Sequence, residues 1–193
     1  MLIVKDNGVV TVATGTDYDM YGGYADQGTE RIPENLQVWR IPNDDGIIAC
    51  AAGSGFEGDA FRYDGKLIEG ELTKEKLVLE TVPKLRRVLG RYGKLDKDGD
   101  MQVRCAFAQK DRVFVISTGF CVSEITDCAA YGRNAGRGTS ALRIAKEMKP
   151  EERILFARRI THENERSPLA FIDTATLTPR IVGVEASGKE ETE

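Results

Sequence analysis

The sequence is poor in the residues on which most catalytic and metal sites depend. It contains one histidine, His162, and four cysteines, Cys50, Cys105, Cys121 and Cys128. The cysteines form no C-x-x-C pair, and no group of Cys, His and Asp has the spacing of metal ligands. We therefore expect no metal site and no cofactor. The cysteines are interpreted as small buried hydrophobic residues in a reducing compartment, and the histidine as a residue at the end of a helix.

The sequence also lacks an excess of either charge and any long apolar run. Its 27 Lys and Arg are interspersed with 31 Asp and Glu, which gives a formal net charge of −4. A protein that binds nucleic acid or membrane surfaces through phosphates needs clustered basic residues, so both partners are excluded as expectations. No apolar run approaches the roughly 20 residues of a membrane span, and the N-terminus does not have the pattern of a signal peptide. We expect a cytoplasmic protein.

The composition is that of an ordinary globular protein, with 41% hydrophobic and 30% charged residues. We predict one domain over residues 1–184. The last stretch, 185–193, is acidic and has few apolar residues, which predicts a frayed tail.

Strand pairs and helix pairs alternate along the chain. Strands are predicted at 2–4, 9–13, 36–41, 47–52, 102–108, 112–117, 125–131, 169–172 and 180–184; helices at 56–63, 73–92 with a break just before Pro83, 138–148 and 150–161; and a loop at 15–33. This order, without single βαβ crossovers, favours an α+β fold of mainly antiparallel sheets covered by helix layers. Because 47–52 is apolar at every position, we expect that strand to lie between a second sheet and a helix layer.

Two motifs fall short of the ligand sites they suggest. The segment 132–139 is rich in glycine, but Arg137 stands where a Walker A loop needs its second glycine. We interpret it as a turn into a closely packed helix. The segment 96–100 has the acidic pattern of a calcium loop, but Gly99 is its fourth residue rather than its sixth. We interpret it as an acidic turn.

Several segments resemble one known family. They are the hairpin Asn7-Gly8-Val9-Val10, the run Val38-Trp39-Arg40-Ile41, the run from Ile47 to Gly53 before a helix, Ala130-Tyr131-Gly132-Arg133, and Pro168 to Ile172. In this order they resemble the proteasome β-subunit family, and most of all its bacterial member, the HslV peptidase. The resemblance implies the four-layer αββα sandwich of N-terminal-nucleophile hydrolases. It also implies a homo-oligomeric ring whose active sites face an inner chamber, and an ATPase or unfoldase as partner.

The chemistry that the resemblance implies uses an N-terminal threonine. Its hydroxyl attacks the peptide carbonyl, its own α-amine accepts the proton, and a nearby lysine lowers the pKa of that amine. In this sequence the nucleophile position falls on Met1, which has no hydroxyl, and removal of Met1 would expose Leu2. The lysine position falls on Gln37. The standard catalytic set is therefore expected to be absent.

The remaining family positions are also changed. The acidic residue falls on Thr14 or, with a shift, on Asp17; the serine of the Gly-Ser-Gly turn falls on Arg133; and the Asp-x-x-Ser pair falls on Asn164 and Ser167. Cleavage at Gly15-Thr16 or Gly28-Thr29 would create an N-terminal threonine. It would also remove the opening hairpin and leave sheet backbone unpaired, so we do not expect it.

Three functions remain open at this stage. The first is a ring-forming, proteasome-like protein without the standard threonine peptidase site, either non-catalytic or divergent. The second is an active peptidase or hydrolase of the same fold with a non-standard nucleophile, for which Ser167, Thr14 and Cys50 are candidates. The third is a structural ring subunit or partner-binding module.

Overall fold

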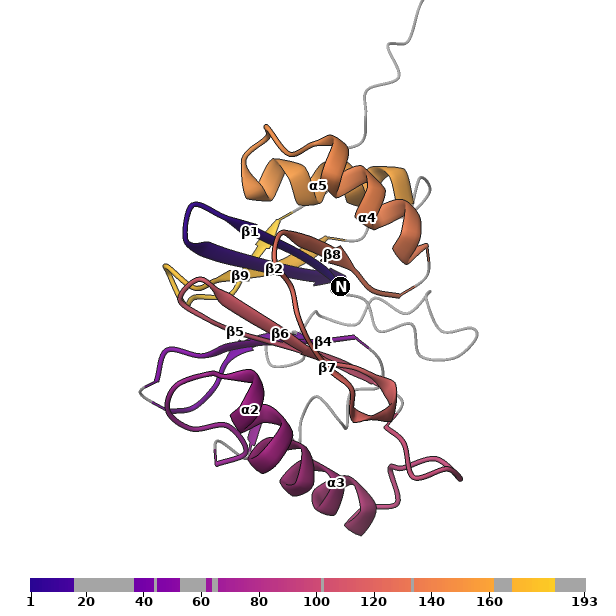
Figure 1. Cartoon of the computed structure of the whole chain (residues 1–193). Helices are drawn as coiled ribbons and strands as arrows, with labels where there is room; N and C mark the ends of the chain where they lie inside the picture. Colours follow the sequence, from indigo (N-terminus) through magenta and orange to yellow (C-terminus); the bar gives the residue numbers. More distant parts are fainter. Residues whose placement is uncertain are drawn as a thin grey trace, which may run out of the picture.

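Two five-stranded sheets are stacked between two layers of helices (Figure 1). The structure is a computed structural model, and it describes residues 1–15, 37–43, 45–52, 62–63, 66–101, 103–132, 134–161 and 168–182. Every strand pair in both sheets is antiparallel. The predicted α+β sandwich is therefore confirmed. None of the helices within the described residues is both long and apolar enough to cross a bilayer.

The first sheet has the strand order β10-β9-β2-β1-β8. Its strands are β1 (Leu2–Asp6), β2 (Val9–Gly15), β8 (Cys128–Ala130), β9 (Leu169–Asp173) and β10 (Arg180–Val182). Asn7 and Gly8 join β1 to β2 with φ of 47° and 79°. Two positive φ values are what a tight hairpin of the predicted Asn-Gly type requires.

The second sheet has the order β3-β4-β5-β6-β7. Its strands are β3 (Val38–Arg40), β4 (Ile48–Ala52), β5 (Arg104–Gln109), β6 (Arg112–Ile116) and β7 (Val122–Glu124), with a short 3-10 turn η3 (Thr118–Phe120) between the last two. In β4, Ile48 and Cys50 face the first sheet, whereas Ala49 and Ala51 belong to the core under the helices. The prediction that this strand is buried on both faces is confirmed.

Below the second sheet lie α2 (Lys74–Lys76), a π-helical segment η2 (Leu77–Thr81) and α3 (Val82–Arg91) (Figure 1). The hydroxyl of Thr73 accepts a hydrogen bond from the backbone N of Lys76 and caps the first turn. The break predicted before Pro83 is the π-helical segment. Proline has no backbone N–H and its ring crowds the preceding turn, so the regular pattern gives way there.

Above the first sheet lie α4 (Ala135–Ile144) and α5 (Pro150–Thr161) (Figure 1). The second helix was predicted with these bounds, but the first begins and ends earlier than the predicted 138–148. It ends at Ile144, and a turn at residues 145–149 connects it to α5. Gly138 packs so tightly on the sheet that an added Cβ would lie 2.7 Å from the Cβ of Ala130.

Of the strand predicted at 125–131, only Cys128–Ala130 (β8) is a strand, and the start of the predicted range is wrong. The chain forms β7 in one sheet, ends its pairing with a hydrogen bond from Ile125 N to Val113 O, and begins β8 in the other sheet three residues later. The chain crosses between the sheets at the exposed residues Thr126 and Asp127, and Figure 1 shows this crossing. Most of the loop predicted at 15–33 and of the helix predicted at 56–63, and the whole tail 185–193, lie outside the described residues.

Candidate functional site

The first residue is held as part of a strand. The α-amine of Met1 donates a hydrogen bond to the carbonyl of Tyr131 at 2.9 Å, and the N–H of Tyr131 donates to the carbonyl of Met1 at 2.8 Å. These two bonds continue the β1–β8 ladder by one residue. The Met1 side chain packs against the core between the two sheets. The N-terminus thus lies at the end of the first sheet, at the level where the sheets face each other (Figure 1).

The α-amine of Met1 is in an unusual electrostatic environment. Burial lowers its pKa below the ordinary value, because the charged form loses its hydration. Cys50 opposes this shift, whereas the positive charges of Arg158 and Arg104 lower the pKa further. An amine with a lowered pKa is unprotonated to a greater extent near neutral pH, and so is a better base.

The two arginines were missed by the sequence analysis, which considered only Gln37 as the source of charge. Arg104 begins β5 and Arg158 lies in the last turns of α5, so they reach the amine from different layers. Nothing in their spacing links them to residue 1. Gln37 instead continues the β3–β4 pairing, since its carbonyl accepts from Ala51 N at 2.8 Å. Because side chains alternate between the two faces of a strand, Gln37 lies on the same face as Trp39, and Trp39 packs toward the helices.

Thr14 is the candidate that the structure brings to Met1. The register of β1 and β2 pairs Leu2 with Ala13, so Met1 lies opposite Thr14. Both residues line a small pocket of about 30 Å³ at the end of the sheet, together with Arg158 and Thr161 of α5. Thr14 itself is 8% exposed.

Cys50 also lies near the amine but is chemically less suited to be a nucleophile. Burial raises the pKa of its thiol to about 12, and the nearby positive N-terminus offsets only part of that rise. Cys50, Cys105 and Cys128 are buried as predicted. The prediction is wrong for Cys121, which is exposed because it lies at the end of the turn η3 rather than inside a strand.

Four of the family positions lie outside the described residues: Asp17, Arg133, Asn164 and Ser167. His162 lies outside them as well. Their placement relative to Met1 stays a prediction.

No group of three or more metal-binding side chains occurs among the residues with described positions. The acidic segment 96–100 forms the predicted turn. The carboxylate of Asp96 accepts hydrogen bonds from the backbone N of Asp98 and of Asp100, both at 2.9 Å. Its acceptors are used locally, as in an ordinary acidic turn.

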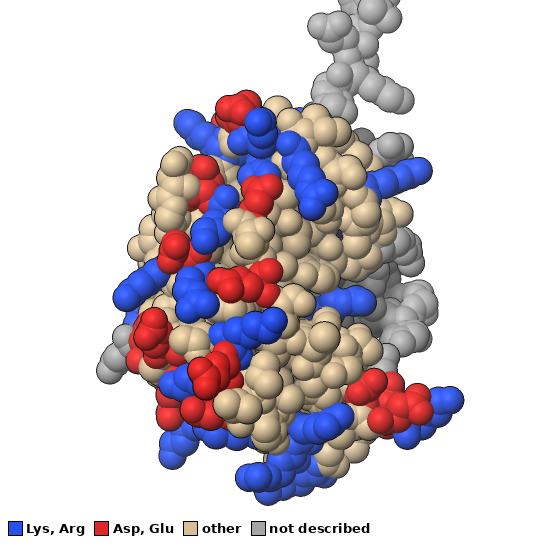
Figure 2. Space-filling model, viewed as in Figure 1, with Lys and Arg blue, Asp and Glu red and all other residues tan. Residues whose placement is uncertain are grey.

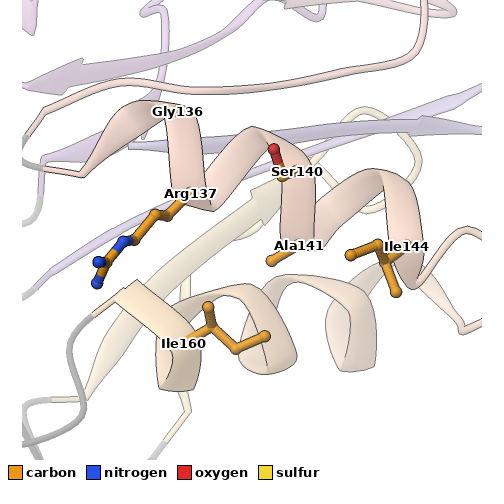
Figure 3. Close-up of a pocket in the computed structure, with 6 residues that line it drawn as sticks. All are labelled: Gly136, Arg137, Ser140, Ala141, Ile144 and Ile160. Atoms are coloured by element: carbon orange, nitrogen blue, oxygen red, sulfur yellow. The ribbon is translucent and has the colours of Figure 1, made fainter.

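A larger hollow lies on the outer surface, between α4 and α5 (Figure 3). It has a volume of about 510 Å³ and is lined by Gly136, Arg137, Ser140, Ala141, Ile144 and Ile160. Its floor is the contact between the two helices, and Arg137 extends along one end. None of the residues that line this hollow is an acid, a histidine or a cysteine.

Solved structures share the fold of two stacked sheets between helix layers over most of the chain. A structure of Thiobacillus denitrificans BPH in complex with epoxomicin matches with a TM-score of 0.70 and 15% identity, over 89% of this chain and 96% of that one. A second structure of the same BPH matches with a TM-score of 0.66 and 16% identity, over 89% and 95%. The chain has the proteasome β-subunit fold.

The eukaryotic HslV of Trypanosoma brucei has the same proteasome fold, with a TM-score of 0.56 and 15% identity over 89% of this chain and 97% of that one. The chain therefore spans nearly the full length of these proteins. No protein-family model matches the sequence, and no curated protein is significantly similar to it. At such low identities, the likeness establishes the proteasome fold and leaves the activity to be argued from the site.

Proposed function

We propose that this chain is a ring-forming, proteasome-like protein that lacks the standard N-terminal threonine peptidase site. The observation that carries the proposal is the identity of residue 1, which is a methionine. Met1 has the position of a first strand residue, its amine bonds to Tyr131, and it brings no hydroxyl or thiol. Since the standard mechanism needs a hydroxyl and a free amine on one residue, this chain cannot perform it as it stands.

Ring assembly is supported by apolar residues on both outer helix layers. On the lower layer Leu79 is 66% and Tyr92 59% exposed, and on the upper layer Ile144 is 76% exposed. Val78, Met148 and Ile160 add to these faces. Exposed large apolar side chains are typical of protein contacts, and on the upper layer Ile144 and Ile160 lie together at the hollow in Figure 3. We propose that other copies of the chain cover these faces.

The charge distribution is consistent with such an assembly. On the face shown in Figure 2, basic and acidic side chains are interspersed, with uncharged surface between them. A surface with charges of one sign only would repel the same surface of another copy, and this face has no such surface.

Mass in solution tests the assembly. We expect multi-angle light scattering to give a multiple of the chain mass over a broad concentration range. Ile144→Glu and Leu79→Glu should each lower that mass if the two faces are subunit contacts. Ile181→Glu is the matched control, because Ile181 is an exposed apolar residue of β10 outside both helix layers. A single-chain mass for the natural protein at every concentration would refute the ring.

Peptide cleavage tests the second part of the proposal. The natural chain should not release fluorophore from standard proteasome substrates through residue 1. Cleavage accompanied by covalent modification of Met1 by a threonine-directed inhibitor would contradict it.

A further inference from the structure

The surface hollow between α4 and α5 combines exposed apolar side chains with a positive charge. Ile144, which is 76% exposed, lies toward one end, Ile160 contributes from α5, and Arg137 extends along the other end (Figure 3). The volume of about 510 Å³ is in the range of about 300–1,000 Å³ that is typical of ligand pockets. Exposed apolar surface of this kind is stabilised when another segment covers it. The hollow therefore suits an occupant that brings both small apolar residues and negative charge.

The helices around the hollow favour an acidic occupant at the end where Arg137 lies. α4 contains Arg137 and Arg143 and has no acidic residue, and the last turn of α5 adds the exposed Arg159. The acidic residues of α5, Glu151 and Glu152, lie in its first turn, at the opposite end of that helix. Positive charge that is concentrated in this way attracts an acidic segment.

Strand β10 ends at the same end of the helix pair. Val182, the last residue of β10, pairs with Leu169 in β9. Leu169 lines the small pocket together with Thr161, the last residue of α5. The side chain of Asn134 donates a hydrogen bond to the carbonyl of Thr161 at 2.9 Å, and Arg137 follows Asn134 by one turn. The chain therefore leaves the first sheet close to the basic end of the hollow.

The sequence that follows β10 has the composition that the hollow suits. Residues 183–193 begin with the small apolar Val184 and Ala186 and continue to Glu190, Glu191 and Glu193. In an extended conformation, this segment spans about 35 Å. A path across one neighbouring strand and one helix takes about 20 Å. The glutamates can therefore reach Arg137 from the end of β10.

We propose that residues 183–193 bind in the hollow between α4 and α5 of the same chain. The glutamates of the segment face Arg137, and its small apolar residues cover Ile160. Binding within one chain does not require a ring, so this inference goes beyond the proposed function. Copies that associate through the upper helix layer have to displace the segment, which makes it a competitor of that contact.

Photo-cross-linking of the full chain tests the proposal. The photoreactive residue p-benzoylphenylalanine replaces the exposed Ser140, which lines the hollow, and mass spectrometry of the peptides identifies what it reaches. We expect cross-links to residues 183–193. The same residue in place of the exposed Arg87 is the matched control, because Arg87 lies in α3 on the opposite helix layer, and it should not reach the segment of its own chain (Figure 1).

An equal mixture of ¹⁵N-labelled and unlabelled protein identifies the chain that supplies the segment. Cross-linked peptide pairs should be entirely light or entirely heavy, because both partners belong to one chain. Mixed pairs at the frequency expected for random combination would show that a second copy supplies the segment, and would overturn the proposal.

Charge reversal tests the contact with Arg137. Arg137→Glu should lower the yield of the cross-link from residue 140 by about fivefold, the factor that one favourable exposed ion pair contributes. Glu190→Lys, Glu191→Lys and Glu193→Lys together should have a similar effect. Combining both sets should restore most of the yield, because opposite charges then face each other again. Arg87→Glu is the control for a general change of charge and should leave the yield unchanged.

The proposal is overturned if position 140 does not cross-link to residues 183–193, or if the charge reversals do not change the yield. Light scattering on the same samples keeps this result separate from the proposed function. A multiple of the chain mass without these cross-links retains the ring and refutes the bound segment. A single-chain mass with cross-links inside one chain refutes the ring and supports the bound segment.

Discussion

Replacement of Gly138 by alanine tests the packing of α4 on the first sheet. Gly138 lies in the helix at its closest approach to β8, and an added Cβ would meet the Cβ of Ala130 at 2.7 Å and the methyl of Thr161 at 3.3 Å. Ordinary contacts between such carbons are about 3.5–4.0 Å, so the helix has to move away by nearly 1 Å. Gly136, in the same helix, has no atom within 4 Å of an added Cβ and is the matched control.

The magnitude follows from two opposed effects. Alanine is favoured over glycine in a helix by up to about 1 kcal/mol, and this gain applies to Gly136→Ala and Gly138→Ala alike. Overpacking of a well-packed contact costs about 1–3 kcal/mol, and only Gly138→Ala incurs it. The difference between the two variants should therefore be about 1–3 kcal/mol. In a protein of this size, about 2 kcal/mol corresponds to roughly 4–8 °C in Tm.

Urea unfolding followed by circular dichroism, at one fixed protein concentration, measures this difference. Gly136→Ala should be as stable as the natural chain or slightly more stable, and Gly138→Ala should be clearly less stable. Equal midpoints for the two variants would refute the close approach of α4 to β8, and with it the interpretation of the glycine-rich segment.

Three further predictions concern charge and thiols. Arg153, whose side chain is 4% exposed, donates to the Leu142 carbonyl at 2.6 Å and to Asp127 at 3.1 Å; Arg153→Ala should therefore lower the free energy of unfolding by about 2–3 kcal/mol in denaturant titration. Burial alone would raise the pKa of Asp173, but hydrogen bonds from Thr176, Arg180 and Ala175 outweigh it and hold the pKa below its usual value. The ionised carboxylate therefore stabilises the fold above its unfolded pKa of about 4, and this stabilisation is lost as pH falls through the lower folded pKa. In Asp173→Asn, the free energy of unfolding should therefore decrease less on acidification than in the natural chain. A native thiol assay should label Cys121 quickly and the other three cysteines only after unfolding, and fast labelling of Cys50 would contradict its burial.

Most of the fold could be predicted because its signals are local. The Asn7-Gly8 turn, the alternation of strand and helix pairs, the helix opened by Pro150 and the break before Pro83 each depend on residues close together in sequence. The stretch 125–131 was misjudged because the crossing between the sheets is made by only two polar, exposed residues, Thr126 and Asp127, and so short a break was taken as part of one strand.

The site was less predictable because it is made by long-range neighbours. The missing hydroxyl at Met1 can be seen in the sequence alone. The arginines that act on its amine come from β5 and α5, more than 100 residues away, and no periodicity connects them to residue 1. Thr14 was considered for the position of an acid. Its pairing with Met1 follows only from the register of β1 and β2.

The most direct test of the central claim is a cleavage assay on the natural chain, with mass spectrometry to confirm that it begins at Met1. Fluorogenic proteasome peptides and epoxomicin, the compound bound in the BPH structure, are the probes. The account predicts no epoxomicin adduct on residue 1 and no peptide cleavage that depends on residue 1. Cleavage that is abolished by an epoxomicin adduct at the N-terminal residue would contradict it.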